Sequence, residues 1–194
     1  MTTNTKFESS PAFFEEKYLK TDDPWDFSGS EYELGRYEAI IAALEHKRYR
    51  RAFEPGCSIG VLTERLSNVC DFVEAIDFSR TAVAQAQKRC SHLRNVDILC
   101  ASIPERMPVT GFDLIVLSEI GYYFAPDEWM RVSSALIDPM PRGGILLAAH
   151  WLGDSKDHCI GGDEVHEILL SLPGVQLEES ERHETFRIDR WVRA

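Results

Sequence analysis

The chain has 194 residues, and its 32 acidic against 21 basic side chains give a formal net charge of −11. This length predicts one domain with a sizeable hydrophobic core. The acidic balance argues against nucleic acid or an anionic membrane as a partner, because both attract clustered positive charge.

Five cysteines, an odd number without a C-x-x-C pair, favour a reduced cytoplasmic protein over a disulfide scaffold and argue against a structural zinc site. The N-terminus lacks the positive-then-apolar pattern of a secretory signal. No apolar run approaches the ~20 residues that a membrane-spanning helix needs. We therefore expect no metal and no membrane association.

The N-terminal part, residues 13–44, predicts two helices on either side of a loop at residues 21–30. Ser30 can cap the second helix, and Glu31 and Glu33 follow in the first turn, where the helix dipole favours negative charge.

From residue 51 the pattern changes to strands alternating with helices, which predicts a mainly parallel sheet of an α/β fold. The final two strands have no helix between them and predict an antiparallel hairpin, turned by residues 182–184. The expected strands are 51–54, 72–76, 96–100, 112–117, 144–150, 175–181 and 185–193, and the expected helices are 61–67, 80–90, 127–138 and 163–172.

A glycine-rich turn follows the first of these strands. Gly56 and Gly60 allow a ligand to approach the backbone, and Ser58 is expected to start the next helix. Asp77 ends the neighbouring strand 21 residues after Gly56, the distance typical of an acidic side chain that binds ribose hydroxyls. Together these residues predict a nucleoside cofactor.

Several motifs in order resemble those of class I S-adenosylmethionine-dependent methyltransferases: the Glu54 to Gly60 turn, Asp77-Phe78-Ser79, residues 112–116 and the Gly143-Gly144 turn. The N-terminal residues 23–37, with Asp23-Pro24-Trp25, narrow the resemblance to one group within this class. They resemble the nodulation-protein-S (NodS) group, N-methyltransferases that act on an amino sugar of a chito-oligosaccharide signal.

The resemblance implies a single Rossmann-like domain with a seven-stranded sheet whose last strand is antiparallel. Residues 1–50 would form lid helices, residues 51–150 the cofactor-binding core, and residues 151–194 an acceptor loop, a helix and the C-terminal hairpin. The cofactor would be S-adenosylmethionine, released as S-adenosylhomocysteine, and the methyl acceptor a small molecule. The implied cofactor residues are Trp25, Arg36, Glu54, Gly56, Cys57, Gly60, Asp77, Phe78, Ala101, Ser102, Ile103, Ser118 and Glu119.

Some of these residues have alternative roles. Arg36 would hold the cofactor carboxylate or pair with Glu33, and Glu54 would meet the cofactor ammonium or cap the turn. Trp25 would close over the cofactor or anchor the N-terminal segment. Ser102 stands where the family often has an aspartate, and a hydroxyl is the weaker acceptor.

The predicted catalytic residues are His150, Glu119 and Tyr122. His150 ends the fifth strand and would act as a base, bind the acceptor, or serve only as a hydrogen-bonded strand-end histidine. Glu119 would bind the acceptor amine or the cofactor, and Tyr122 would face the sulfonium. His158, His166 and His183 have no ligand spacing, and we expect them on the surface or in helices.

Most alternatives to an N-methyltransferase belong to other classes. Gly56-Cys57-Ser58-Ile59-Gly60 also fits the G-x-S-x-G turn of α/β-hydrolases, with Ser58 as nucleophile, although too few strands precede it. A nicotinamide oxidoreductase would require G-x-G-x-x-G. An O-methyltransferase of a small metabolite and a non-catalytic cofactor-binding protein share most of the cofactor residues.

Overall fold

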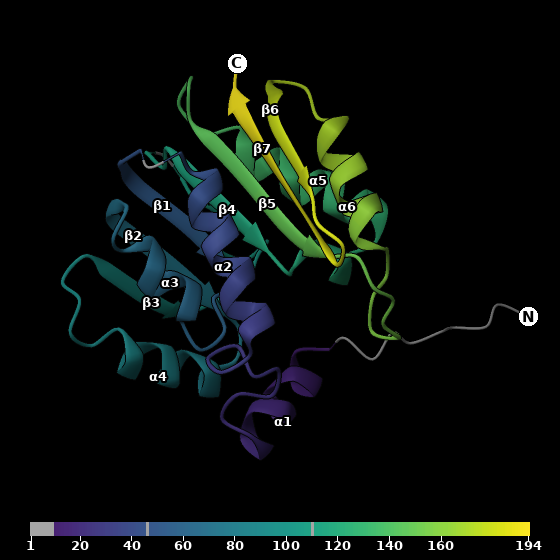
Figure 1. The fold of residues 1–194 in the computed structure, drawn as a ribbon. Coiled ribbons are helices and arrows are strands. Elements are labelled where there is room, and N and C mark those ends of the chain that lie inside the picture. The colour runs from purple at the N-terminus through teal and green to yellow at the C-terminus, as the bar shows by residue number, and fades with distance from the viewer. Residues whose placement is uncertain (1–9, 46, 110) are drawn as a thin grey trace, which may run out of the picture.

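The computed structural model describes residues 10–45, 47–109 and 111–194. Its centre is a seven-stranded sheet in the order β3-β2-β1-β4-β5-β7-β6 (Figure 1). The pairs from β3 to β5 are parallel, and β7 lies antiparallel between β5 and β6. The strands are β1 (Tyr49–Pro55), β2 (Cys70–Asp77), β3 (Val96–Cys100), β4 (Leu114–Ser118), β5 (Ile145–Trp151), β6 (Val175–Arg182) and β7 (Phe186–Arg193).

Helices cover both faces of this sheet. Alternating side chains of each strand enter opposite apolar clusters: Leu114 and Val116 of β4 pack with α2 and α3, whereas Ile115 and Leu117 pack with α5 and α6. The described helices are α1 (Pro11–Lys20), α2 (Glu31–Ala43), α3 (Val61–Leu66), α4 (Arg80–Arg89), the 3₁₀ turn η1 (Gly121–Tyr123), α5 (Pro126–Ile137) and α6 (Gly162–Leu170).

The predicted order of elements and the antiparallel tail are confirmed, with ends that shift by a few residues. Two details of the prediction are wrong. The Ser30 side chain makes no capping hydrogen bond to α2. Ser58 does not start helix α3, which begins at Val61 as its predicted range has it, because Ser58 and Gly60 have positive φ angles of 51° and 79° that no right-handed helix allows.

The last strand is tied to the N-terminal half of the chain. The buried Arg190 of β7 donates to the carbonyl oxygen of Ala43 at 3.0 Å and to the carboxylate of Glu45 at 2.6 Å. These contacts hold the C-terminal end of α2 against the sheet.

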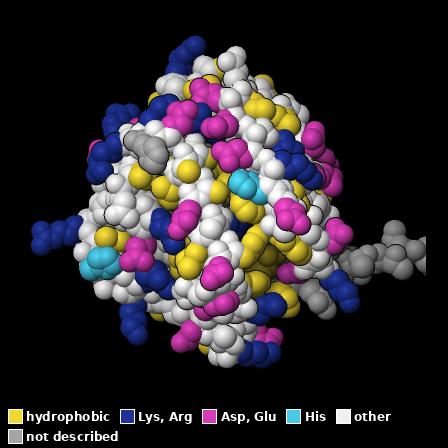
Figure 2. Space-filling model, in the orientation of Figure 1, with side chains coloured by type: hydrophobic (Ala, Val, Ile, Leu, Met, Phe, Trp, Pro, Cys, Tyr) yellow, Lys and Arg dark blue, Asp and Glu magenta, His cyan; other side chains and the backbone are white. Residues whose placement is uncertain are grey.

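Helix α1 lies apart from the two helical layers, beside the carboxyl ends of the parallel strands (Figure 1). On the face shown in Figure 2, Lys and Arg side chains are scattered among acidic ones rather than gathered into one patch. Within the described parts of the chain, every helix is too short or too polar to cross a membrane.

Candidate functional site

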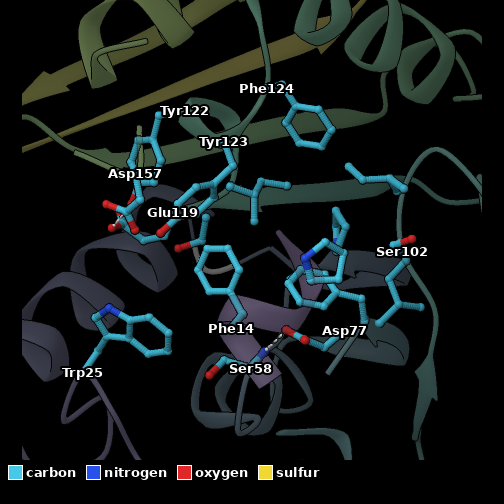
Figure 3. Close-up of a pocket in the computed structure, with 18 of the residues that line it drawn as sticks. Phe14, Trp25, Ser58, Asp77, Ser102, Glu119, Tyr122, Tyr123, Phe124 and Asp157 are labelled. Atoms are coloured by element: carbon cyan, nitrogen blue, oxygen red, sulfur yellow. Dashed lines mark hydrogen bonds between the residues drawn. The ribbon is translucent and has the colours of Figure 1, made fainter. Parts of the chain in front are cut away.

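A cavity of about 670 Å³ opens at the carboxyl ends of the parallel strands, between α1 and the loop that follows β5. Because parallel strands end at one edge of the sheet, residues far apart in sequence meet here. The structure brings together ten of the predicted site residues along its wall: Trp25, Gly56, Asp77, Phe78, Ala101, Ser102, Ile103, Ser118, Glu119 and Tyr122. Figure 3 shows Asp77 and Ser102 toward one end and Glu119, Tyr122 and Asp157 toward the other.

The turn after β1 requires glycine at its first position. Gly56 has a φ of +77°, and a Cβ atom there would lie 2.4 Å from Cγ2 of Ile120. Both the backbone conformation and the space exclude a larger residue. The turn therefore leaves its backbone open to the cavity beside the end of β4.

Asp77 connects this turn to the end of β2. Its two carboxylate oxygens accept the backbone N–H groups of Ser58 and Ser79, each at 2.9 Å (Figure 3 shows the Ser58 bond). Burial raises the pKa of Asp77 to about 6, although these two hydrogen bonds oppose the shift. Each oxygen keeps a second lone pair, so the carboxylate can accept further hydrogen bonds from a ligand.

The rim beyond Asp77 is formed by the residues after β2 and β3. The Phe78 ring lines the cavity and is 37% exposed, so part of its apolar face is open to a ligand. Ser102 also lines the cavity, but its hydroxyl donates to the carboxylate of Glu105. The Ser102 hydroxyl proton is therefore already committed within the chain.

At the other end of the cavity, one arginine forms ion pairs with two carboxylates. Arg36 of α2 is 1% exposed and forms ion pairs with Glu33 and Glu119. Burial alone would lower the pKa of Arg36, but these two carboxylates raise it above its ordinary value, whereas burial raises the pKa of Glu33. Of the two roles expected for Arg36, the structure gives the ion pair with Glu33; Arg36 itself does not line the cavity.

Glu119 has a left-handed backbone conformation, with a φ of 59°, and its carboxylate has three partners, one of them the ion pair with Arg36. Besides Arg36, the backbone N–H of Trp151 donates to it at 2.7 Å and the Tyr122 hydroxyl donates to its other oxygen. Burial and the Glu119 charge raise the pKa of Tyr122 well above its ordinary value, so its hydroxyl stays protonated. Non-glycine residues with a positive φ cluster at functional sites, which makes Glu119 a candidate functional residue.

His150 does not reach the cavity. Its ring is completely buried behind the wall, and its Nε2 accepts the backbone N–H of Gly121 at 3.0 Å. An Nε2 atom in this bond has no lone pair for a substrate proton. The structure therefore places His150 in the third of its expected roles, a hydrogen-bonded strand-end histidine.

His158, which was expected on the surface or in a helix, is a half-buried loop residue that lines the cavity. Its ring stacks on Tyr122 with 3.8 Å between centroids, and its Nδ1 is buried without a hydrogen-bond partner among the described residues. Burial lowers the pKa of His158, so the imidazole is neutral near pH 7. Trp151 and Asp157 line the same region.

Helix α1 covers the end of the cavity that Asp77 lines. The Tyr18 hydroxyl lies 2.5 Å from Oγ of Ser58, and Glu15 accepts the hydroxyls of Ser79 and Thr81 at 2.6 Å. Phe14 packs edge-on against Phe78, with centroids 5.6 Å apart. Sequence reasoning missed these contacts, since nothing in the short pattern of α1 indicates which side of the molecule it covers.

The remaining predicted residues support the site from outside the cavity. Glu54 is buried and accepts the Thr63 hydroxyl at 2.6 Å, and burial raises its pKa to about 7. Cys57 and Gly60 are buried beside α4. Among the described residues, no group of three or more His, Cys, Asp and Glu side chains is arranged to hold a metal ion.

The hydrolase alternative is wrong on geometry. Ser58 has the positive φ of a nucleophile elbow, but its hydroxyl pairs with a tyrosine, Tyr18, rather than with a histidine. A serine nucleophile needs a base within hydrogen-bond reach. Burial and the Asp77 charge raise the pKa of Tyr18, so its hydroxyl keeps its proton and is a poor base.

Comparison with known proteins identifies the family. The model of the family Nodulation protein S (NodS) matches residues 12–142. A nodulation protein S from Rhizobium tropici is 27% identical over 163 residues, which cover 79% of this chain and 67% of that protein.

Two solved structures share the fold over most of the chain. The N-methyltransferase NodS from Bradyrhizobium japonicum WM9, in complex with S-adenosylhomocysteine, has a TM-score of 0.82 at 22% identity and covers 94% of this chain and 98% of its own. A putative methyltransferase from Pseudomonas syringae has a TM-score of 0.73 at 32% identity, with 84% and 100% covered. Because the family match extends over more than half of the residues, this chain belongs to the nodulation protein S family, with the fold of class I S-adenosylmethionine-dependent methyltransferases.

Proposed function

We propose that this chain transfers the methyl group of S-adenosylmethionine to the nitrogen of an amino sugar or a related amine. Family and fold give the reaction class. The nitrogen acceptor is supported by the Bradyrhizobium japonicum relative, which is an N-methyltransferase, and by the charge of the cavity.

The residues at one end of the cavity suit a nucleoside cofactor. The turn at Gly56 leaves backbone open beside Ile120, Asp77 can accept two ribose hydroxyls, and the exposed Phe78 ring can lie against an adenine. Ser102 is the weaker candidate for the adenine edge, because its hydroxyl already donates to Glu105. When bound, the cofactor supplies an electrophilic methyl group on a sulfonium.

The other end of the cavity is lined by more acidic than basic groups, and this observation carries the proposal. Two carboxylates, Glu33 and Glu119, share the one guanidinium of Arg36. Asp157 adds a further carboxylate on the same wall. A cavity with this balance attracts a cationic amine in preference to an anionic or neutral acceptor.

Aromatic side chains complete this acceptor end. Tyr32, Trp151 and Tyr122 line it together with the carboxylates. Aromatic faces attract cations and pack against the apolar faces of a sugar ring. An amino sugar therefore fits both features of this end, because its amine suits the carboxylates and its ring suits the aromatic faces.

The attacking amine must be neutral, so its proton has to leave. His158 faces the cavity and its lowered pKa keeps a lone pair available near pH 7, so we assign proton acceptance to His158. Glu119 orients the amine, and Tyr122 holds Glu119 through its hydroxyl. His150 takes no proton in this scheme, because Gly121 occupies its Nε2.

The decisive experiment compares two acceptors that differ in one group. A short chito-oligosaccharide with one free amino group and its fully N-acetylated form are incubated with the enzyme and labelled S-adenosylmethionine. We expect transfer to the free amine alone, with mass spectrometry locating the methyl group on nitrogen. Equal transfer to the acetylated form would identify an oxygen acceptor and overturn the nitrogen assignment.

Calorimetry with S-adenosylhomocysteine tests the reaction class separately. Failure of the folded protein to bind it would overturn the whole proposal. Binding without transfer to any amine or alcohol would indicate a non-catalytic cofactor-binding protein.

A further inference from the structure

Three titratable side chains form a buried chain that the proposed reaction does not use. His150 of β5, His166 of α6 and Asp189 of β7 are each 0% exposed and lie between the sheet and α6. His150 Nδ1 is 3.2 Å from His166 Nε2, and His166 Nδ1 is 2.8 Å from the Asp189 carboxylate. Buried polar groups of this kind cost free energy unless every one is paired.

One backbone group fixes the direction of the whole chain. The N–H of Gly121 can only donate, so Nε2 of His150 must accept, and His150 must carry its proton on Nδ1. His150 then donates to Nε2 of His166, which must in turn carry its own proton on Nδ1 and donate to Asp189. Both imidazoles are therefore neutral and in the same tautomer.

Asp189 anchors the far end of the chain. Besides His166, it accepts the Ser180 hydroxyl at 2.6 Å and pairs with the Arg187 guanidinium at 2.7 Å. Burial alone would raise the pKa of Asp189, but these hydrogen bonds hold it below its ordinary value. The anchor is thus an anion that favours a donating Nδ1–H on His166.

The near end of the chain meets the cavity wall at a tightly packed point. A Cβ atom on Gly121 would lie 2.4 Å from Val165 and 3.0 Å from Nε2 of His150. Gly121 begins η1, whose next residue, Tyr122, donates its hydroxyl to Glu119 and accepts the backbone N–H of Cys159 at 2.7 Å. The Gly121 N–H therefore fixes the place of Tyr122, which binds both Glu119 and the loop that carries His158.

We infer that the Asp189–His166–His150 chain is a positioning device that fixes η1, and through Tyr122 the acceptor side of the cavity. It is not a proton pathway, because it ends on a peptide N–H. Its geometry stands on the hydrogen bonds alone, whereas its effect on methyl transfer rests on the proposed function.

Nitrogen-15 NMR of the histidine side chains tests the geometry without any cofactor. We expect two histidines, assigned by the loss of their signals in His150→Gln and His166→Gln, that are neutral and protonated on Nδ1 at pH 7. If a variant does not fold, replacing the other four histidines, His46, His92, His158 and His183, leaves only the signals of the two buried rings. Either buried ring protonated on Nε2, or charged, would overturn the inference.

Kinetics test the positioning role with three variants of α6. His166→Phe removes both nitrogens, His166→Gln keeps one donor and one acceptor, and Leu169→Ala removes buried apolar volume from the same helix and serves as the control for destabilisation. We expect His166→Phe to lower kcat/KM for the acceptor at least tenfold and to speed hydrogen exchange of the Gly121 amide. S-adenosylhomocysteine binding should stay within about twofold, and His166→Gln should recover part of the loss.

Wild-type kinetics in His166→Phe, or an equal kinetic loss in Leu169→Ala, would overturn the inference. If the wild-type protein transfers no methyl group to any acceptor, the proposed function fails instead. The tautomers and the Gly121 exchange rate then still decide whether the chain positions η1.

Discussion

The Asp77 carboxylate accepts the backbone N–H of Ser58 at 2.9 Å, so the end of β2 holds the turn that follows β1. The same carboxylate lines the cavity. One side chain thus shapes the glycine-rich turn and presents a charge to the ligand that the turn receives.

Replacing Asp77 with Ala removes both contributions. We expect S-adenosylhomocysteine binding to weaken by about 1–3 kcal/mol, as for a lost hydrogen bond to a charged group, measured by calorimetry. Asp97→Ala, an exposed aspartate on the neighbouring β3, is the control and should leave binding unchanged. Equal affinities of Asp77→Ala and wild type would remove Asp77 from the cofactor site.

Gly56→Ala and Gly35→Ala should change stability in opposite directions. At Gly56 the new Cβ meets Ile120 and the φ of +77° is strained, so we expect a loss of about 1–3 kcal/mol on urea unfolding. At Gly35, inside α2, nothing lies within 4 Å of the Cβ position, so we expect a gain of about 0.5–1 kcal/mol. Ile120→Ala should recover part of the loss in Gly56→Ala, and an additive double mutant would contradict the clash.

Tyr18→Phe removes the hydroxyl that joins α1 to Ser58. A hydrogen bond contributes about 1 kcal/mol, so the state in which α1 is detached from the Ser58 turn should become about fivefold more populated. Limited trypsin digestion should then cleave faster after Lys17 and Lys20, with mass spectrometry locating the cuts. Leu19→Ala, at a side chain that is 70% exposed on the same helix, should cleave at the wild-type rate.

Glu54 makes the stability of the fold depend on pH. Its carboxyl ionises near 4.5 when unfolded, but burial raises its folded pKa to about 7, so the folded state holds a proton that the unfolded state has lost. Its stabilising contribution is full below pH 4.5 and is lost as the pH rises through about 7.

Glu54→Gln does not titrate and isolates this contribution. The unfolding free energy of the variant, minus that of wild type, should rise by about 1–3 kcal/mol across this pH window. Urea unfolding of both proteins at several pH values measures this difference in unfolding free energy. The contributions of all other titrating groups are common to both proteins and cancel. A difference that does not vary with pH would show that Glu54 ionises normally.

His158→Gln should slow methyl transfer without loosening the cofactor. General bases contribute about 10²–10⁴-fold to a rate, and we expect kcat to fall by about 10²-fold while S-adenosylhomocysteine binding is retained. His183→Gln, in the hairpin turn outside the cavity, should behave as wild type. An unchanged kcat in His158→Gln would mean that solvent takes the proton.

Residues at strand ends could be predicted from the sequence because parallel strands align them. Gly56 follows β1, and Asp77 and Ser118 end β2 and β4, so their meeting at one edge is a consequence of topology. Arg36 had a usable signal as well, since Ile40 and Ala43 follow it by four and seven residues, which places it on the apolar face of α2.

His158 and the role of His166 had no such signal. His158 lies in an aperiodic loop, where the sequence does not indicate which way a side chain points. His166 was expected on the surface or in a helix, and α6 does carry it, but its partners Asp189 and His150 come from two other elements. Such contacts depend on how helix and sheet pack, which local pattern does not encode.

The contacts of Arg190 also have a consequence for synthesis of the chain. Its guanidinium binds Ala43 and Glu45, which lie 147 and 145 residues earlier. A ribosome makes the N-terminal part first, so α2 is translated long before the strand that secures its end. The helix that carries Arg36 and Glu33 therefore gains this anchor only after Arg190 of β7, 145 residues beyond Glu45, has been translated.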